Sequence, residues 1–136
     1  IKQRFKKIDL VLSPAIGGIV IGYEVGRQLR INTIFAERES GTLSLRRGFE
    51  IQAQSNVLIV EDVITTGKSA LECVKIINMS NANLVGYACI IDRSNETLLI
   101  KDKIISQIKL NIKTFTNNEI PIELQKIRPV KPGSRS

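Results

Sequence analysis

Short apolar runs alternate with longer amphipathic stretches along this chain. The runs are rich in Ile, Leu and Val, which is typical of strands that are covered on both faces and need not alternate. They predict strands at residues 8–12, 33–38, 48–52, 57–62 and 84–92. The amphipathic stretches have apolar residues spaced by three or four, and they predict helices at residues 17–29 and 67–79. A period of two at residues 108–115 predicts an edge strand.

This order of strands and helices predicts an α/β fold with a doubly wound, mostly parallel sheet flanked by helices. Such sheets bind ligands at the carboxyl ends of their strands. The chain has 136 residues and no internal repeat, so we expect a single domain over residues 1–136. Residues 115–136 lack a regular pattern and predict an irregular C-terminal segment. In the helix at 17–29, Gly22 and Gly26 would allow close approach to the sheet.

The segment from Val57 to Ser69 carries the strongest chemical signal. Its strand ends on two carboxylates, Glu61 and Asp62, and a short turn with a glycine then leads into a helix. A helix N-terminus exposes backbone N–H groups, which suit a phosphate. Carboxylates beside that phosphate would repel it unless they bind another part of the ligand. The combination therefore predicts a sugar phosphate, whose hydroxyls contact the acids.

Two simpler interpretations of this segment are a P-loop and a helix start without a ligand. Gly67, Lys68 and Ser69 resemble the end of a nucleotide-triphosphate P-loop, but that motif needs a glycine where this chain has Asp62. Alternatively, the acids only complement the helix dipole and a threonine only caps the helix. Two adjacent acids directly before Thr65 favour the ligand-binding interpretation.

The motif at residues 61–69 resembles the phosphoribosyl-pyrophosphate motif of the type I phosphoribosyltransferases, and the orotate branch matches best. Other segments agree with the family in order and spacing. Ser13–Gly18 is similar to the family's pyrophosphate loop. Residues 35–39, followed by 45–49, are similar to its mobile catalytic loop and flanking strands. Pro129–Arg135 is similar to the C-terminal ending of one bacterial orotate branch. The resemblance implies transfer of a phosphoribosyl group from phosphoribosyl pyrophosphate to orotate, giving orotidine 5'-monophosphate and pyrophosphate in pyrimidine biosynthesis.

The resemblance also implies roles for residues at matching positions. Glu61 and Asp62 would accept the ribose 2- and 3-hydroxyls, directly or through water on Mg²⁺, which prefers oxygen ligands. The 5-phosphate would be bound by Thr65, Thr66, Gly67, Lys68 and Ser69. Main-chain N–H groups for pyrophosphate would come from Ala15, Ile16, Gly17 and Gly18, next to a peptide expected to be strained or cis. Many relatives carry a lysine at the position of Gly17.

A mobile, solvated loop is expected from Arg38 to Arg47, and its closure would exclude water. The family's loop brings lysines and a histidine, but this loop has neither, so Arg38, Arg46 or Arg47 would supply the charge. The alternative is a surface hairpin with ion pairs. Arg93 matches the arginine that holds the orotate carboxylate, and Asp92 would orient it. Here the alternative is an ordinary exposed loop residue.

The remaining expectations concern surroundings and partners. The chain begins at Ile1, and Lys2 to Lys7 indicate the end of a preceding helix, so the N-terminal part of the family's hood over the base is expected to be missing. Residues 115–136 would contribute to that hood. Family members are usually homodimers. Cys73 and Cys89 lie in apolar contexts and predict two reduced core thiols. With no predicted membrane span or signal peptide, the cytoplasm is expected.

Three other functions stay open at this point. The net charge of +7 allows a phosphoribosyl-pyrophosphate-binding regulator that contacts nucleic acid, but few aromatic residues lie among the cations, so nucleic acid is disfavoured. An inactive homologue would fold without turnover. A phosphoribosyltransferase for another base conflicts with Arg93, because purines have no carboxylate for it to bind.

Overall fold

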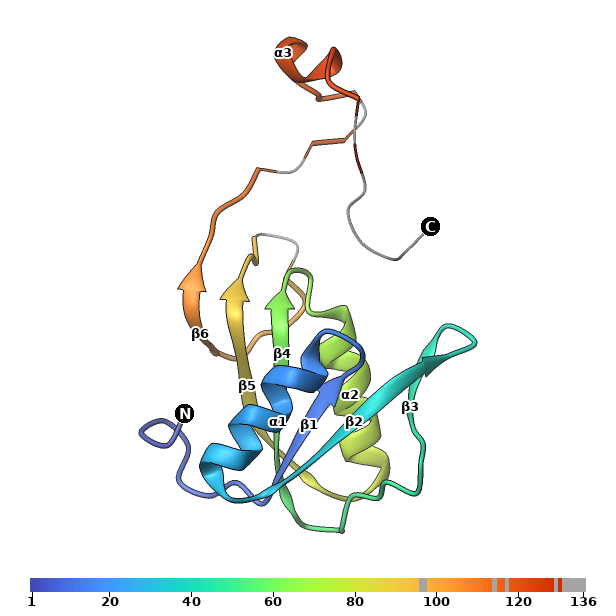
Figure 1. The fold of residues 1–136 in the computed structure, drawn as a ribbon, viewed down its shortest axis with the longest axis vertical. Coiled ribbons are helices and arrows are strands. Elements are labelled where there is room, and N and C mark those ends of the chain that lie inside the picture. The colour runs from blue at the N-terminus through green and yellow to red at the C-terminus, as the bar shows by residue number, and fades with distance from the viewer. Residues whose placement is uncertain (96–97, 114, 117, 129, 131–136) are drawn as a thin grey trace.

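The structure is a computed structural model that describes residues 1–95, 98–113, 115–116, 118–128 and 130 (Figure 1). The strands are β1 (Leu10–Pro14), β2 (Asn32–Glu39), β3 (Thr42–Leu45), β4 (Asn56–Ile64), β5 (Asn83–Asp92) and β6 (Ile104–Lys109). The helices are α1 (Gly18–Leu29), α2 (Lys68–Met79) and the short α3 (Ile122–Gln125). The two long helices and four of the predicted strands therefore lie close to their predicted ranges.

All six strands form one sheet in the order β3-β2-β1-β4-β5-β6. Five of them run parallel, and only β3 is antiparallel to its neighbour β2. Because β1 lies in the middle and the chain then extends to both sides of it, the sheet is doubly wound. The predicted fold class is confirmed.

The two long helices cover opposite faces of this sheet. Along β1, Leu10 and Leu12 pack in the larger apolar cluster with residues of α2, such as Ile77. Val11, between them, packs in the smaller cluster with Val25 of α1. Successive strand residues point to opposite faces, so a continuous apolar run buries both of them. This explains why β1 and β4 carry so few polar residues.

Glycines bring α1 close to the sheet, as expected. A side chain at Gly22 would overlap Ser13 of β1, and one at Gly26 would overlap Thr33 of β2. The Thr33 hydroxyl also donates a hydrogen bond to the Gly22 carbonyl at 3.2 Å. The close approach fixes the start of α1 directly above the carboxyl end of β1.

The strand predicted at residues 48–52 is absent, and β3 lies at 42–45 instead. The turn between β2 and β3 consists of Ser40 and Gly41, both with positive φ (48° and 88°), as in the two-residue turns that suit hairpins. Leu43 is only 4% exposed, so the alternation of polar and apolar residues here buries a strand face. The sequence carried this signal, but the polar Ser-Gly-Thr run favoured a loop.

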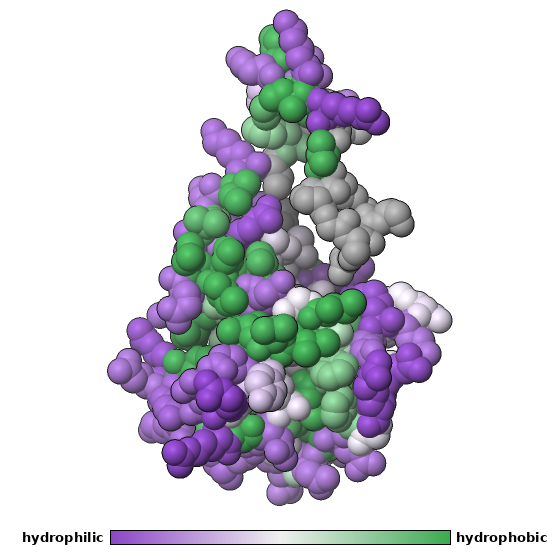
Figure 2. Space-filling view, viewed as in Figure 1, coloured by the Kyte–Doolittle hydropathy of each residue, from purple (hydrophilic) through white to green (hydrophobic). Residues whose placement is uncertain are grey.

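The edge strand is also displaced from its prediction, since β6 spans Ile104–Lys109 rather than residues 108–115. Its partner β5 ends at Asp92, and the last link is the hydrogen bond from the Leu110 N–H to the Asp92 carbonyl, 2.8 Å long. The alternating residues beyond it have no strand to pair with. Figure 2 shows apolar side chains along this region and over α1.

The N–H groups of Arg4 and Phe5 donate hydrogen bonds to the Ile1 carbonyl, so the chain forms a turn here. Beyond β6 the chain rises away from the sheet to α3 in Figure 1, in the irregular C-terminal segment. Of the Pro129–Arg135 ending, only Val130 is among the described residues. Cys73 and Cys89 are buried and free, as predicted. No helix in the described ranges is long and apolar enough to cross a membrane.

Candidate functional site

Three turns meet at the carboxyl edge of the sheet, after β1, β4 and β5. Backbone hydrogen bonds join the last two, from the Arg93 N–H to the Ile64 carbonyl (2.8 Å) and from the Leu99 N–H to the Thr66 carbonyl (2.9 Å). The turn after β1 meets β4 through Gly17, which lies against the Asp62 side chain. Parallel strands end at the same edge, so segments far apart in sequence assemble here.

The two acids point to opposite faces of β4. Glu61 pairs in register with Cys89 on the α2 face and lines a hollow of about 60 Å³. Its other lining residues come from β4 and the following turn, namely Val63, Thr65, Thr66, Gly67, Lys68 and Ser69. Asp62 lies on the α1 face, and its carboxylate occupies the space that a side chain at Gly17 would need. The pair therefore spans the strand. Glu61 lies beside the turn at Thr65–Ser69, which is predicted to bind a phosphate and is called the phosphate turn below, and Asp62 lies beside the turn at Ala15–Gly18, called the glycine turn.

Neither carboxylate has a compensating partner in the described part of the chain. Burial raises the pKa of Glu61 to about 7, and the nearby charge of Asp62 adds to the rise. An acid pair without cations is costly, and ligand hydroxyls or a bound cation would relieve it. Among the described residues, no three His, Cys, Asp or Glu side chains cluster as metal ligands. Two carboxylates do fit Mg²⁺, which commonly joins one or two of them to substrate phosphates.

The turn after β4 is shaped by Gly67. Its φ is 77°, and a side chain there would approach Ile100 to 2.7 Å, so both backbone and packing require glycine. The first turn of α2 follows, where backbone N–H groups have no acceptor within the helix. Among the described residues, the one side-chain contact to these N–H groups is long, 3.4 Å from the Lys68 N–H to the Thr66 hydroxyl. This turn offers free donors to an anion.

In the turn after β1, the backbone N–H of Ala15 is occupied, and the predicted roles of the other three residues stay predictions. The Ala15 N–H donates to the Ala36 carbonyl at 2.8 Å, so it is not free for pyrophosphate. The prediction of Ala15 as a backbone donor is wrong in this conformation. Ile16, Gly17 and Gly18 remain, and the Ala15–Ile16 peptide is cis, as anticipated for this turn. Pairing of Ala15 with β2 could not be inferred from the local pattern.

The segment Arg38–Arg47 forms a hairpin, and its arginines are paired with acids. The mobility expected for this segment stays a prediction. Arg38 contacts Glu72 of α2 (2.9 Å), Arg46 contacts Glu39 (3.6 Å), and Arg47 contacts Glu37 (2.7 Å). The alternative weighed for this segment, a surface hairpin with ion pairs, describes it better. None of the three arginines lines the hollow beside Glu61.

Arg93 follows β5 and is half-buried. Its Nε is buried and has no hydrogen-bond partner among the described residues, an unusual state for a guanidinium nitrogen. Asp92 does not orient it, contrary to expectation, because Asp92 accepts the Ser94 N–H (2.8 Å) and faces Lys109 (3.7 Å). Burial alone would raise the pKa of Asp92, but these contacts lower it. Arg93 is thus left free for a ligand.

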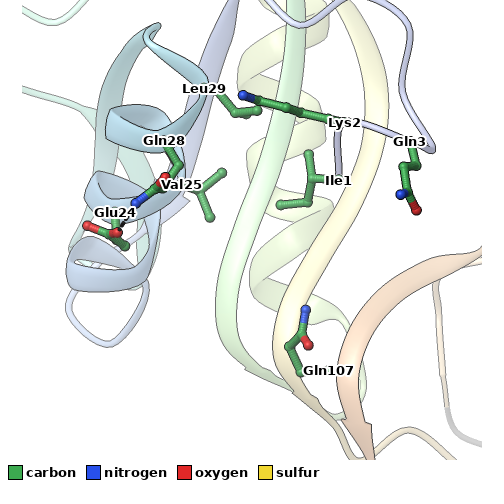
Figure 3. Close-up of a pocket in the computed structure, with 8 residues that line it drawn as sticks. All are labelled: Ile1, Lys2, Gln3, Glu24, Val25, Gln28, Leu29 and Gln107. Carbon is green, nitrogen blue, oxygen red and sulfur yellow. Dashed lines mark hydrogen bonds between the residues drawn. The ribbon is translucent and has the colours of Figure 1, made fainter.

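A larger hollow lies elsewhere. It has a volume of about 460 Å³ between the N-terminal residues, the second half of α1 and β6 (Figure 3). Lys2, Glu24 and Gln28 mix with apolar Val25 and Leu29 in its wall, and Gln28 donates to Glu24 at 2.8 Å. It shares no residue with the turns at the carboxyl edge.

Comparison with known proteins now gives the family. The model of the phosphoribosyl transferase domain matches residues 1–126, almost the whole chain. This chain belongs to the phosphoribosyltransferase family. The matched range includes the turns after β1, β4 and β5.

Curated relatives narrow the comparison. The chain is 47% identical over 137 aligned positions to an orotate phosphoribosyltransferase of Methylorubrum extorquens, covering 100% of this chain and 70% of the relative. The chain is 44% identical to an orotate phosphoribosyltransferase of Thermoanaerobacter sp., and the alignment covers 99% of this chain and 71% of the relative. The phosphoribosyltransferase chain thus spans about 70% of the length of these relatives.

Solved structures agree on the fold. Adenine phosphoribosyltransferase from Thermoanaerobacter pseudethanolicus superposes with a TM-score of 0.66 at 18% identity, over 76% of this chain and 71% of that one. Orotate phosphoribosyltransferase from Aeropyrum pernix gives 0.64, also at 18% identity, over 79% and 64%. At this identity the superpositions support the fold and leave the base unspecified.

Sequence reasoning missed two features of the site. Glu72 holds the hairpin onto α2, yet nothing in the sequence pairs it with Arg38, 34 positions earlier. Ile100 covers the phosphate turn from the segment after β5. The hairpin itself had a signal, the Ser40-Gly41 turn between alternating residues.

Proposed function

We propose that this phosphoribosyltransferase transfers the 5-phosphoribosyl group of phosphoribosyl pyrophosphate to orotate, giving orotidine 5'-monophosphate and pyrophosphate. The main support is the 44–47% identity to orotate phosphoribosyltransferases over nearly the whole chain. Arg93, at the same carboxyl edge of the sheet as Glu61 and Asp62, adds independent support. Its unpaired guanidinium would bind the carboxylate that orotate carries.

Binding of the sugar phosphate uses both faces of β4. The 5-phosphate accepts hydrogen bonds from the N–H groups and hydroxyls of the turn at Thr65–Ser69, in the hollow beside Glu61. The ribose hydroxyls donate to Glu61 and Asp62. The diphosphate then lies toward the turn after β1, where the N–H groups of Ile16, Gly17 and Gly18 donate to it. Each group of the ligand thus faces protein groups of complementary charge or hydrogen-bonding character.

The reaction breaks the bond between the anomeric carbon and the diphosphate and forms a bond to the orotate ring nitrogen, whose proton is released to solvent. Positive charge develops on the sugar ring as the bond breaks, and the two carboxylates stabilise that charge. Mg²⁺, held by the substrate with Glu61 and Asp62, would neutralise the diphosphate. Arginine cannot donate a proton at neutral pH, so the leaving group is stabilised by charge rather than by protonation.

Base recognition rests on Arg93. Its guanidinium offers a planar pair of N–H donors, which match a carboxylate. Because Asp92 contacts Ser94 and Lys109, it does not form an ion pair with Arg93, and the guanidinium remains available to the ligand. Adenine has no carboxylate, so the shared fold with adenine enzymes does not imply a shared substrate.

The protein forms a homodimer, which the exposed apolar side chains of Ile16 (82%) and Val20 (77%) beside the glycine turn support. It acts in the cytoplasm, where its two buried free thiols would stay reduced. Sedimentation equilibrium tests the first point, with a monomer at micromolar concentration as the contrary result. Fractionation of cells that express the protein tests the second.

The deciding experiment measures pyrophosphate release with phosphoribosyl pyrophosphate and Mg²⁺, in the presence of orotate or of adenine. We expect release only with orotate. Release only with adenine would replace the proposed base. Tight binding of phosphoribosyl pyrophosphate without release would instead indicate a regulator or an inactive homologue.

A further inference from the structure

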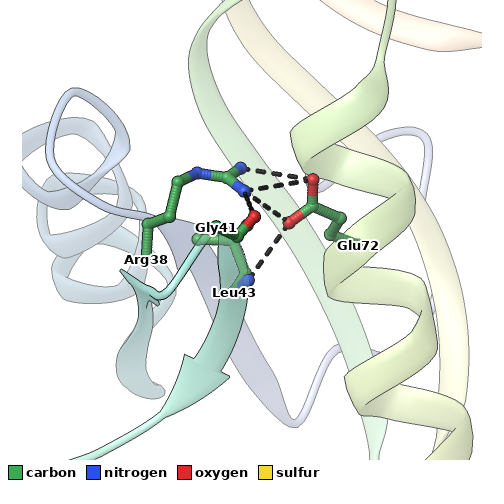
Figure 4. A network of polar contacts seen from close by, with 4 residues as sticks. All are labelled: Arg38, Gly41, Leu43 and Glu72. Carbon is green, nitrogen blue, oxygen red and sulfur yellow. Dashed lines mark hydrogen bonds and ion pairs between the residues drawn. The ribbon is translucent and has the colours of Figure 1, made fainter.

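Glu72 joins the hairpin to the helix that begins at the phosphate turn. Its carboxylate, 13% exposed, accepts hydrogen bonds from the Arg38 guanidinium (2.9 and 3.3 Å) and from the Leu43 N–H (3.1 Å). Arg38 donates in turn to the Gly41 carbonyl at 2.5 Å. Figure 4 shows these groups converging on one carboxylate from both strands of the hairpin.

This link is unusual among the ion pairs of the described residues at the carboxyl edge. Arg46 and Arg47 pair with Glu39 and Glu37, which lie on the hairpin itself, so those pairs cannot place it relative to the rest of the protein. Glu72 belongs to α2, which starts at Lys68 in the phosphate turn. Lys68 and Glu72 are four residues apart, one helical turn, and their charges interact.

We propose that Glu72 is a positioning residue for phosphoribosyl transfer: it sets the β2–β3 hairpin, and Arg38 with it, at a fixed distance from the phosphate turn. This proposal rests on the proposed function. Glu72 touches no substrate in this scheme and acts only through Arg38 and the Leu43 N–H. The helix between Lys68 and Glu72 is rigid, so the position of a bound phosphate and the position of the hairpin become coupled.

The physical consequence is a loss of alignment when the carboxylate is removed. Without it the Leu43 N–H and the Arg38 guanidinium lose the Glu72 acceptor, and the hairpin is held by the pairing of β2 with β1 and by the packing of Leu43. A displacement of about 1 Å of a charged group near the reacting atoms can lower the rate by up to about a hundredfold. The cost should fall on the use of phosphoribosyl pyrophosphate, because orotate is bound by Arg93 at the other side of the edge.

The first test measures position without turnover. Hydrogen exchange of the Leu43 amide should become about tenfold faster in Glu72→Gln or Glu72→Ala, because its acceptor is weakened or lost. The matched control is Glu24→Gln on α1, whose carboxylate also accepts two bonds from an arginine, Arg27, at 2.8 Å each. That variant should leave Leu43 exchange unchanged. Unchanged exchange in both Glu72 variants would overturn the proposal.

The second test measures the reaction. We expect Glu72→Gln to lower kcat/KM for phosphoribosyl pyrophosphate about tenfold and to leave KM for orotate within about twofold. Combined with Arg38→Gln, it should add nothing to the effect of Arg38→Gln alone, because both act through one contact. Multiplying effects, or equal losses for both substrates, would contradict the proposal.

These tests also separate the two proposals. A wild-type protein that releases no pyrophosphate refutes the proposed function. In that case faster Leu43 exchange with weaker binding of phosphoribosyl pyrophosphate by calorimetry would still support the coupling through Glu72. Binding unchanged by Glu72→Gln would refute it.

Discussion

The charged residues at the end of β4 and those of the β2–β3 hairpin lie at the same edge of the sheet but differ in their partners. Glu61 and Asp62 have no compensating group among the described residues, and the Arg93 Nε nearby has no acceptor. In the hairpin, Arg38, Arg46 and Arg47 are each paired with an acid. Unpaired charges cost stability and are kept for a ligand, whereas paired ones maintain local structure.

The largest effect is expected at Asp62. Asp62→Asn should lower kcat/KM for phosphoribosyl pyrophosphate about 100- to 1,000-fold, because it removes a charge that stabilises the developing positive charge. Its Tm should change little, since the carboxylate has no protein partner to lose. Initial-rate kinetics and thermal melts on the same preparation measure both. Comparable losses in activity and stability would make Asp62 a structural residue.

Arg93 gives the next largest effect. Arg93→Ala should raise KM for orotate about 10- to 100-fold and leave KM for phosphoribosyl pyrophosphate nearly unchanged. Arg93→Lys is the control that keeps the charge, and it should recover the affinity only in part because lysine cannot bind a carboxylate with two parallel bonds. An unchanged KM for orotate in Arg93→Ala would remove this residue from the site.

Glu61 should show an opposite effect on stability. Its pKa rises from 4.5 in the unfolded chain to about 7 in the fold, so the folded state holds an extra proton between these values. Ionisation therefore costs stability as the pH rises from 4.5 to 7, and the cost is complete above 7. Glu61→Gln should stabilise the empty protein by about 1–3 kcal/mol at pH 8 and hardly at all below pH 4.5.

Chemical denaturation at pH 5 and pH 8 measures this difference for the wild type and Glu61→Gln. The same variant should use phosphoribosyl pyrophosphate poorly, so stability and activity change in opposite directions. A variant that is less stable than the wild type at pH 8 would show that Glu61 has a structural partner after all.

The smallest effect is expected at Arg47, whose ion-pair partner lies on the hairpin itself. Arg47→Gln removes an exposed ion pair with Glu37 and should lower Tm by no more than about 2 °C, because exposed pairs contribute little. Activity should stay within about twofold. The catalytic role first considered for Arg46 and Arg47 stays untested, and a large loss of kcat in Arg47→Gln with an unchanged Tm would support it and break the contrast between the two regions.

The parts of this fold that sequence predicts well are those determined by local pattern and backbone geometry. Continuous apolar runs predicted β1, β4 and β5, and Gly67 marked the start of α2 because only glycine fits its φ and its contact with Ile100. The acid pair and the turn were found for the same reason. Their placement on one edge follows from the parallel order of the strands.

The parts that sequence missed depend on partners far along the chain. The Ala15 N–H is occupied by β2, and Glu72 accepts from a residue 34 positions earlier. Strand geometry predicts that Glu61 and Asp62 face opposite sides of β4. It does not predict which residues lie next to them on each side. The ends of β3 and β6 are set by where their partner strands run, and no local pattern shows that.

The most direct test of the account is a crystal structure of the protein soaked with phosphoribosyl pyrophosphate and Mg²⁺. We expect the 5-phosphate within hydrogen-bond distance of the N–H groups of Thr66 to Ser69, with the ribose hydroxyls within hydrogen-bond distance of the Glu61 and Asp62 carboxylates. A ligand bound in the hollow lined by Lys2 and Glu24, or an empty edge at saturating ligand, would contradict the assignment of this site.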